Sequence, residues 1–119
     1  MRVLAAVAAA ALVATGSAHA ATPPIKITRV QVTGKEFWYA LSRHTVVAGP
    51  AIVEFVNYGE DPHDMRVQRA GGGRLFKAPV LQSGQYYDLA LTLVPGRYRL
   101  WCSIANHRQL GMQAMLVVT

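Results

Sequence analysis

The chain has 119 residues, a formal net charge of +6 at pH 7, 52% hydrophobic residues and a single cysteine. This length supports one small domain with a single core and excludes a two-domain enzyme. The twelve basic residues are scattered along the chain. Nucleic-acid binding would favour a basic cluster with interleaved aromatic residues. The scattered charge instead indicates a solvated basic surface, which would favour an acidic partner or an anionic envelope surface without choosing between them.

The N-terminus, "MRVLAAVAAAALVATGSAHA", has the pattern of a secretory signal peptide. One basic residue, Arg2, precedes an apolar run over residues 3–14, and a small-x-small motif follows at residues 18–20. The run is too short to span a membrane, which takes about 20 residues. We therefore predict a signal peptide over residues 1–20 and an exported, periplasmic or secreted, mature domain over residues 21–119, with no transmembrane segment.

The mature region predicts an all-β fold. Short runs rich in Val, Ile, Tyr, Phe and Leu alternate with Gly, Pro and Asn, and no stretch shows a sustained helical period. The predicted strands are residues 25–33, 35–42, 51–57, 63–69, 86–93, 96–102 and 112–118. Residues 70–84 have the weakest pattern and include three consecutive glycines, which predicts a flexible loop. About seven to eight strands in 100 residues indicate a single-domain β-sandwich or small barrel.

Cys102 is unusual because exported proteins normally pair their cysteines. An unpaired cysteine is either a thiol with a function, half of an intermolecular disulfide, or a small buried apolar residue. Side chains alternate along a strand, so Cys102 lies on the face opposite Arg97 and Arg99 and points inward. The same alternation points His63 inward at the start of its strand and Asp64 the other way.

The stretch "WCSIANHRQLGM" places His107 five residues after Cys102 and Met112 five residues after His107. Together with His63, these residues form the ligand set of a blue copper site, which has two imidazoles, one thiolate and a weak axial thioether. Two of them also have an ordinary alternative: His63 as a turn histidine and Met112 as a core residue. Zinc is the weaker candidate, since structural zinc sites use several cysteines and no methionine.

The other candidate ligands fit a metal site less well. His19 belongs to the predicted signal peptide, and His44 lies beside a basic residue before a turn, a pattern typical of a surface position. Met65 is predicted to pack in the core. Met115 has the opposite strand parity to Met112 and is therefore not expected to reach the same site.

From "NYGEDPHD" through "PGRYRLWCSIANHRQLGM" the chain resembles the cupredoxins, small blue copper electron carriers. The C-x4-H-x4-M loop is most similar to the loops of rusticyanin and sulfocyanin, and the resemblance covers essentially all of the mature chain. It implies a Greek-key β-sandwich that holds one type 1 copper ion, cycling between Cu(I) and Cu(II). It also implies that His63, Cys102 and His107 are the equatorial ligands and Met112 the axial one.

The resemblance implies a one-electron carrier that is not an enzyme. Copper enzymes with a related loop have a histidine beside the cysteine, whereas Trp101 and Ser103 flank Cys102 here. No Ser–His–acid or paired-carboxylate set is evident. The alternative is copper storage, delivery or resistance, which favours exposed Met- and His-rich sites rather than one closed set. We expect a monomer that meets a transient redox partner with an acidic docking surface and does not bind nucleic acid.

Two residues depart from the usual cupredoxin pattern. Asp64 stands where many members have Asn, and a carboxylate near the copper would favour the oxidised state and lower the reduction potential. Arg108 places a cation beside His107. Ala105 and Leu110 are expected to form part of a small apolar docking patch. A patch of this size would suffice, because weak redox encounters bury less than about 1,200 Å².

Overall fold

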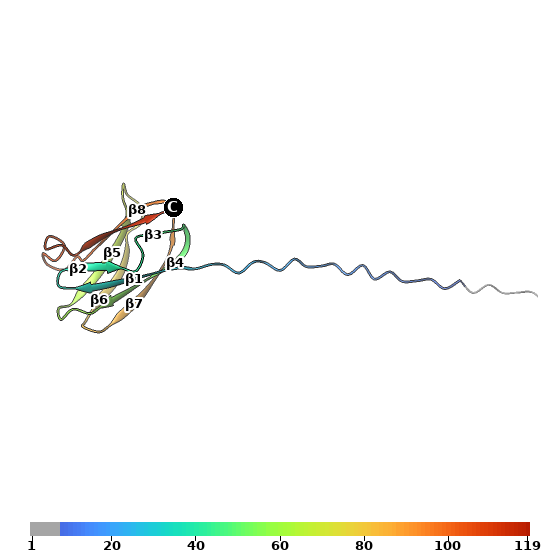
Figure 1. Cartoon of the computed structure of the whole chain (residues 1–119), viewed down its shortest axis with the longest axis horizontal. Coiled ribbons are helices and arrows are strands. Elements are labelled where there is room, and N and C mark those ends of the chain that lie inside the picture. Colours follow the sequence, from blue (N-terminus) through green and yellow to red (C-terminus); the bar gives the residue numbers. More distant parts are fainter. Residues whose placement is uncertain (1–7) are drawn as a thin grey trace, which may run out of the picture.

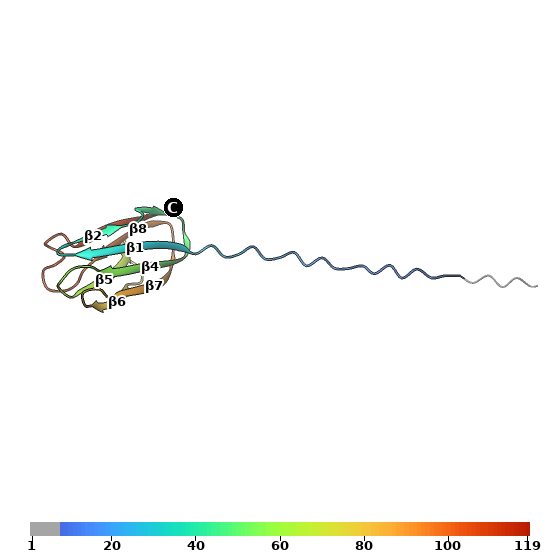
Figure 2. The ribbon, with the colours of Figure 1, turned by 60° about the horizontal axis from the view of Figure 1, so that its bottom comes forward.

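The computed structural model describes residues 8–119 and contains nine strands in two sheets (Figures 1 and 2). The strands are β1 (Thr28–Lys35), β2 (Trp38–Leu41), β3 (Thr45–Val46), β4 (Gly49–Asn57), β5 (His63–Arg69), β6 (Phe76–Leu81), β7 (Tyr86–Leu93), β8 (Gly96–Trp101) and β9 (Gln113–Val118). One sheet has the order β2-β1-β4-β7, and the other has the order β3-β9-β8-β5-β6. The expected all-β sandwich is confirmed, with nine strands rather than seven or eight.

The core lies between the two sheets because each strand turns its apolar side chains to the same interior. In β1 the burial alternates residue by residue, and in β8 Tyr98 and Leu100 are buried while Arg97 and Arg99 are exposed. Such alternation is what a strand with one covered face requires. Two strand pairs are parallel, β1 with β4 and β3 with β9, and the others are antiparallel.

The prediction of a loop over residues 70–84 is wrong in its second half, because β6 (Phe76–Leu81) pairs with β5. The pattern "FKAPVL" hides this strand because it contains a proline, which cannot donate a ladder hydrogen bond. β6 is an edge strand, and the register shifts between His63 and Met65 on β5, where Leu81 and Ala78 are their partners. An edge position with a bulge is where a strand tolerates proline.

The predicted boundaries of the first strands also shift. β1 continues to Lys35, and the second strand begins only at Trp38, after a turn at Glu36 and Phe37. β1 is long because it pairs with β4 from Thr28↔Ala51 onward. The turn therefore falls at one end of the sandwich rather than near its middle.

Residues 8–27 contain neither helix nor strand and extend away from the sandwich (Figure 1). The first seven residues of the predicted signal peptide lie outside the described residues, and its cleavage stays a prediction. From residue 8 onward, no helix has the length and apolarity needed to cross a membrane.

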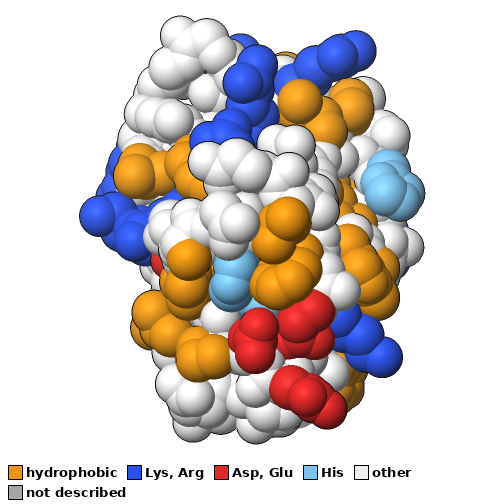
Figure 3. Space-filling view, turned by 90° about the vertical axis from the view of Figure 1, so that its left-hand side faces the viewer, with side chains coloured by type: hydrophobic (Ala, Val, Ile, Leu, Met, Phe, Trp, Pro, Cys, Tyr) orange, Lys and Arg blue, Asp and Glu red, His pale blue; other side chains and the backbone are white. Residues whose placement is uncertain are grey.

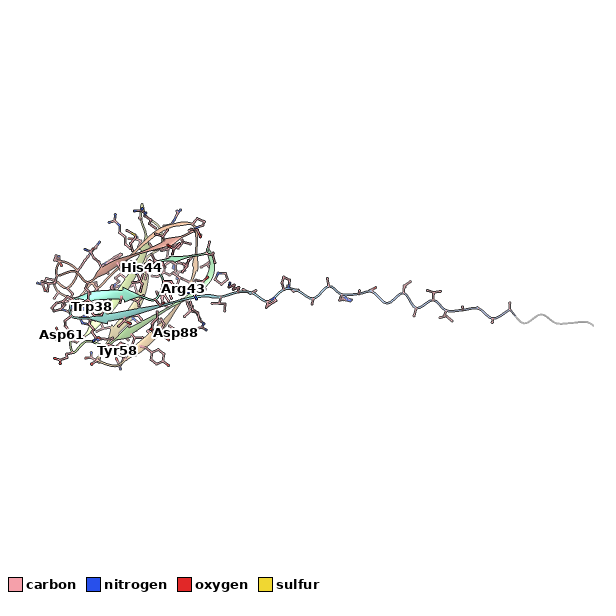
Figure 4. The ribbon with its side chains drawn as sticks, in the orientation of Figure 1. Trp38, Arg43, His44, Tyr58, Asp61 and Asp88 are labelled. Atoms are coloured by element: carbon pink, nitrogen blue, oxygen red, sulfur yellow. The ribbon has the colours of Figure 1, made fainter. Side chains whose placement is uncertain are left out.

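Four connections meet at the end of the sandwich opposite this N-terminal segment. They are the β1–β2 turn, the β4–β5 loop, the β6–β7 loop and the β8–β9 loop (Figure 1). Figure 4 shows three labelled residues toward that end: Trp38 at the start of β2, and Tyr58 and Asp61 in the β4–β5 loop. This loop end contains the candidate site.

Candidate metal centre

The four predicted ligands all lie at the loop end. His63 is the first residue of β5, Cys102 follows β8 directly, His107 lies in the β8–β9 loop, and Met112 directly precedes β9. All four are buried, with exposed fractions of 0% for His63, 1% for Cys102, 8% for His107 and 0% for Met112. Residues far apart in sequence are therefore brought into one interior region.

Three of these side chains form a compact triangle of donor atoms. The Nδ1 atoms of His63 and His107 are 3.2 Å apart, and Cys102 Sγ lies 4.0 Å from the first and 3.6 Å from the second. The circumradius of a triangle with these sides places a point about 2.1 Å from all three atoms, which matches metal–nitrogen bonds of about 2.0–2.1 Å and is about 0.2 Å shorter than a metal–sulfur bond. The donor set therefore fits one metal ion.

Backbone hydrogen bonds fix the β8–β9 loop that carries three of the candidates. The N–H of Cys102 donates to the carbonyl of Met112 at 3.1 Å, and the N–H of Met112 donates to the carbonyl of His107 at 3.0 Å. The methyl carbon of Met112 packs so closely on Gly34 that a Cβ there would lie 3.1 Å from it. Met112 thus lies between the loop and β1, and its role as axial ligand stays a prediction.

Asp64 joins the two segments that carry the donors. Its Oδ1 accepts the backbone N–H of Ser103 at 2.7 Å, its Oδ2 accepts the Ser103 hydroxyl, and Arg66 Nε lies 3.3 Å from Oδ2. The alternation along β5 turns Asp64 away from His63, and these contacts leave it only 2% exposed. The Asp64 carboxylate therefore holds Ser103, the residue after Cys102, against the start of β5, which carries His63.

The environment of the Cys102 sulfur favours a neutral thiol until a metal binds. Burial raises the pKa of the Cys102 thiol, although backbone N–H groups of Asp64 and Ile104 donate to the sulfur and act in the opposite direction. A metal ion binds the thiolate and releases the proton. The same two N–H groups then stabilise the bound thiolate.

Glu36 is a further residue of the site that sequence reasoning missed. Its Oε1 accepts from His63 Nε2 at 3.0 Å, which fixes the proton on Nε2 and leaves Nδ1 free toward the sulfur. The backbone N–H of Asp61, at 2.7 Å from the same oxygen, is the main reason that the pKa of the Glu36 carboxyl is lowered to about 2. Glu36 is therefore ionised at neutral pH.

Close packing holds Glu36 in this position. A Cβ on Gly59 would overlap the Glu36 carboxylate, so a larger residue there would displace this carboxylate from its present position. The contact depends on the β1–β2 turn meeting the β4–β5 loop in space. No motif within either segment signals that meeting, so the sequence alone could not have revealed it.

Phe37 covers both imidazoles from the β1–β2 turn. Its ring centroid lies 4.6 Å from that of His107 and 6.2 Å from that of His63, the latter in an edge-on arrangement. Water is therefore kept from most of the donor triangle. His107, at 8% exposed, is the member of the triangle that reaches the surface.

The remaining candidates lie elsewhere. His44 is exposed in the loop between β2 and β3 (Figure 4), Met65 is fully buried in the core, and Met115 pairs with Arg99 on the outer face of its sheet. Among residues 8–119, the one group of three or more His, Cys, Asp or Glu side chains placed to hold a metal ion is the donor triangle. The Arg108 guanidinium lies 4.7 Å from the Trp101 ring centroid.

Comparison with solved structures identifies the fold. Rusticyanin from Thiobacillus ferrooxidans superimposes with a TM-score of 0.66 at 14% identity, covering 81% of this chain and 79% of that one. Auracyanin A from Chloroflexus aurantiacus gives 0.62 at 15% identity, covering 79% of this chain and 100% of that one. A purple cupredoxin from Nitrosopumilus maritimus gives 0.56 at 19% identity, covering 77% of this chain and 99% of that one. The chain has the cupredoxin fold.

The cupredoxin fold is recognised here through structure and not through overall sequence similarity. No family model matches the sequence, and no curated protein matches it. At 14–19% identity, the alignments with these three structures establish the architecture alone. The chemistry of the metal centre therefore depends on its own residues.

Removing the Glu36 carboxylate tests its positioning role. We expect Glu36→Ala to lower Cu(I) affinity about 10–100-fold, because His63 loses the acceptor that orients it. Glu36→Gln keeps an acceptor oxygen and should lose less. Competition with a chromophoric chelator measures the affinities, and Glu60→Ala, at an exposed acid in the neighbouring loop, is the matched control. Equal affinities for the two alanine variants would contradict this role.

Proposed function

We propose that this protein is a blue, type 1 copper protein that carries one electron at a time between redox partners. The observation that carries the proposal is the buried triangle of two imidazole nitrogens and one cysteine sulfur, with a common point about 2.1 Å from each. His63, Cys102 and His107 would be the equatorial ligands. Met112, at the foot of the same loop, would be the axial one.

Donor chemistry favours copper over zinc. A His₂Cys set with a nearby thioether is the ligand set of blue copper sites, whereas structural zinc sites are closed by four nitrogen, thiolate or carboxylate ligands. The architecture supports this choice, because auracyanin A, which shares the fold, is described as a "blue" copper protein. One copper ion would supply a reversible step between Cu(I) and Cu(II).

The surrounding residues would keep the donors in place in both oxidation states. Glu36 orients His63, the Asp64–Ser103 hydrogen bonds hold the cysteine segment, and Phe37 excludes water. A rigid, dry site limits the rearrangement that accompanies a change of charge on the metal. The His107 edge gives an electron a short route to the surface.

Burial of the site favours electron transfer over copper handling. A storage or delivery protein must exchange its metal, and an exposed site serves that purpose better than donors that are at most 8% exposed. Within residues 8–119 the donor triangle has no second group of metal-binding side chains beside it, which also favours a carrier over an enzyme. We further propose export with a signal peptide over residues 1–20 and a monomeric mature domain over residues 21–119.

Optical and EPR spectra of the Cu(II)-loaded protein test the proposed function. We expect an intense blue or purple thiolate-to-copper absorption band with narrow copper hyperfine splitting, because the thiolate is a direct equatorial ligand. Cys102→Ala should abolish the band and His107→Ala should change it strongly. His44→Ala, the exposed-histidine control, should leave it unchanged. A colourless product, or weak bands unaffected by Cys102→Ala, would contradict the proposal.

The charge of Asp64 should tune the reduction potential. Asp64→Asn removes a negative charge near the cysteine but keeps an oxygen that accepts the Ser103 N–H, so we expect the potential to rise. Asp88→Asn makes the same charge change at an exposed position on β7 and should alter the potential much less. Protein-film voltammetry measures both variants. A potential that is unchanged or lower in Asp64→Asn would refute the charge effect.

A further inference from the structure

Five of the twelve Lys and Arg residues lie on or against the outer face of the five-stranded sheet. This basic face carries Arg66 on β5, Lys77 on β6, Arg97 and Arg99 on β8, and Arg108 from the β8–β9 loop. The one acid on these strands, Asp64, is buried against Arg66. The other five acids of the sequence are Glu36, Glu54, Glu60, Asp61 and Asp88, all on β4, β7 or the connections at the loop end.

Trp101, the last residue of β8, lies among three of these arginines. Arg66 is its cross-strand partner, Arg99 is the next residue on the same face of β8, and the Arg108 guanidinium stacks 4.7 Å from the ring centroid. Three guanidinium groups therefore surround one half-buried indole. Among the described residues, Arg66 has a carboxylate within 4.0 Å, and Arg99 and Arg108 have none.

A hollow of about 320 Å³ opens on this face between the two arginines that lack a carboxylate partner. Arg99 and Arg108 line it together with Gln113 and Met115 from β9. Guanidinium groups bind carboxylates with two parallel hydrogen bonds. The hollow therefore suits an acidic side chain presented by another protein, with the thioether and the aliphatic arginine stems as apolar walls.

We propose that the basic face around Trp101 docks a redox protein with an acidic surface. The proposal rests on the proposed function, and charge complementarity supports it, because opposite potentials steer encounters between redox proteins. Tryptophan and arginine are also the residues most enriched at the energetic centres of protein interfaces. Trp101 is bonded directly to Cys102, so a partner docked here lies one residue from the copper-binding sulfur.

The loop end is a poor alternative for an acidic partner. Glu36, Glu60 and Asp61 lie together there, since the Asp61 and Glu60 backbone N–H groups both donate to the Glu36 carboxylate. Figure 3 shows acidic side chains side by side on this end, while most Lys and Arg side chains lie toward its upper and left margins. Contacts between like charges oppose binding, so an acidic partner is repelled by the loop end and binds the basic face in preference.

Electron transfer from reduced cytochrome b5, an acidic haem protein, tests the proposal. One electron passes from ferrous haem to Cu(II), giving ferric haem and Cu(I), and stopped-flow absorbance gives the second-order rate constant. In the Cu(II)-loaded full chain at low ionic strength, we expect Arg99→Gln/Arg108→Gln to lower this constant about tenfold. The control Arg29→Gln/Arg43→Gln, which removes two exposed cations elsewhere, should lower it less than about twofold.

A second pair of variants covers the case in which Arg108→Gln disturbs the ligand loop. Arg99→Glu reverses a charge on β8 outside the loop, and Arg29→Glu reverses one on the opposite sheet. The rate constant should fall at least as far in Arg99→Glu as in the double variant. Equal rate constants for Arg99→Glu and Arg29→Glu would overturn the proposal.

Amide chemical shifts of the ¹⁵N-labelled Cu(I)-loaded chain separate this proposal from the proposed function. Adding cytochrome b5 should shift the Trp101 indole N–H and backbone amides of β5, β8 and β9, even if no electron passes. Shifts there without electron transfer would uphold the docking face and refute the carrier function. Electron transfer with shifts confined to residues 58–62 and 105–110 would refute the docking face. Binding to phosphatidylglycerol vesicles but not to cytochrome b5 would also refute it and assign the face to an anionic membrane.

Discussion

The site depends on how the ends of β5 and β8 are held together where their ladder stops. The last backbone pair between these strands is Arg66↔Trp101, and beyond it lie His63 on one side and Cys102 on the other. Asp64 continues the connection with its side chain by accepting two hydrogen bonds from Ser103. The Asp64 carboxylate, which accepts two hydrogen bonds, thus takes the place of backbone ladder bonds beyond this pair. The nitrogen and sulfur atoms of His63 and Cys102 that form the donor triangle lie on the opposite, interior side of the sheet.

This connection explains how polar donors can occupy an apolar interior. Buried polar groups are costly unless they are paired, and among the described residues no buried side-chain nitrogen or oxygen is without a hydrogen-bond partner. His63 is paired with Glu36, and the Tyr39 hydroxyl donates to the Asp64 carbonyl. Burial raises the pKa of Tyr39, so this donor keeps its proton. The buried polar groups next to the donor triangle therefore already have hydrogen-bond partners.

The charge distribution follows from the same architecture. β8 ends at Trp101, directly before the inward-pointing Cys102, so the side chain of Trp101 lies on the outer face of the five-stranded sheet. The acid that accepts a hydrogen bond from His63, Glu36, lies instead at the loop end. A metal centre between these two regions would meet partners of opposite charge on different surfaces.

Strand alternation was sufficient to predict the most important placements from sequence. In β8 the arginines belong in solvent, so the alternate residues, which include Cys102, point to the interior. In β5 the same alternation points His63 to the interior, on the face opposite Asp64 and Arg66. The edge strand β6 was missed because proline and a bulge obscure its pattern. Glu36 and the stacking of Arg108 on Trp101 were missed because both depend on segments that meet only in the folded chain.

The most direct test of this account is copper-edge X-ray absorption on the loaded protein in both oxidation states. We expect two nitrogen scatterers and one short sulfur scatterer in Cu(II) and in Cu(I), with little change in distance, because the fold and not the metal sets the donor positions. Loss of the sulfur, or replacement of an imidazole by water in either state, would contradict a site preformed by His63, Cys102 and His107.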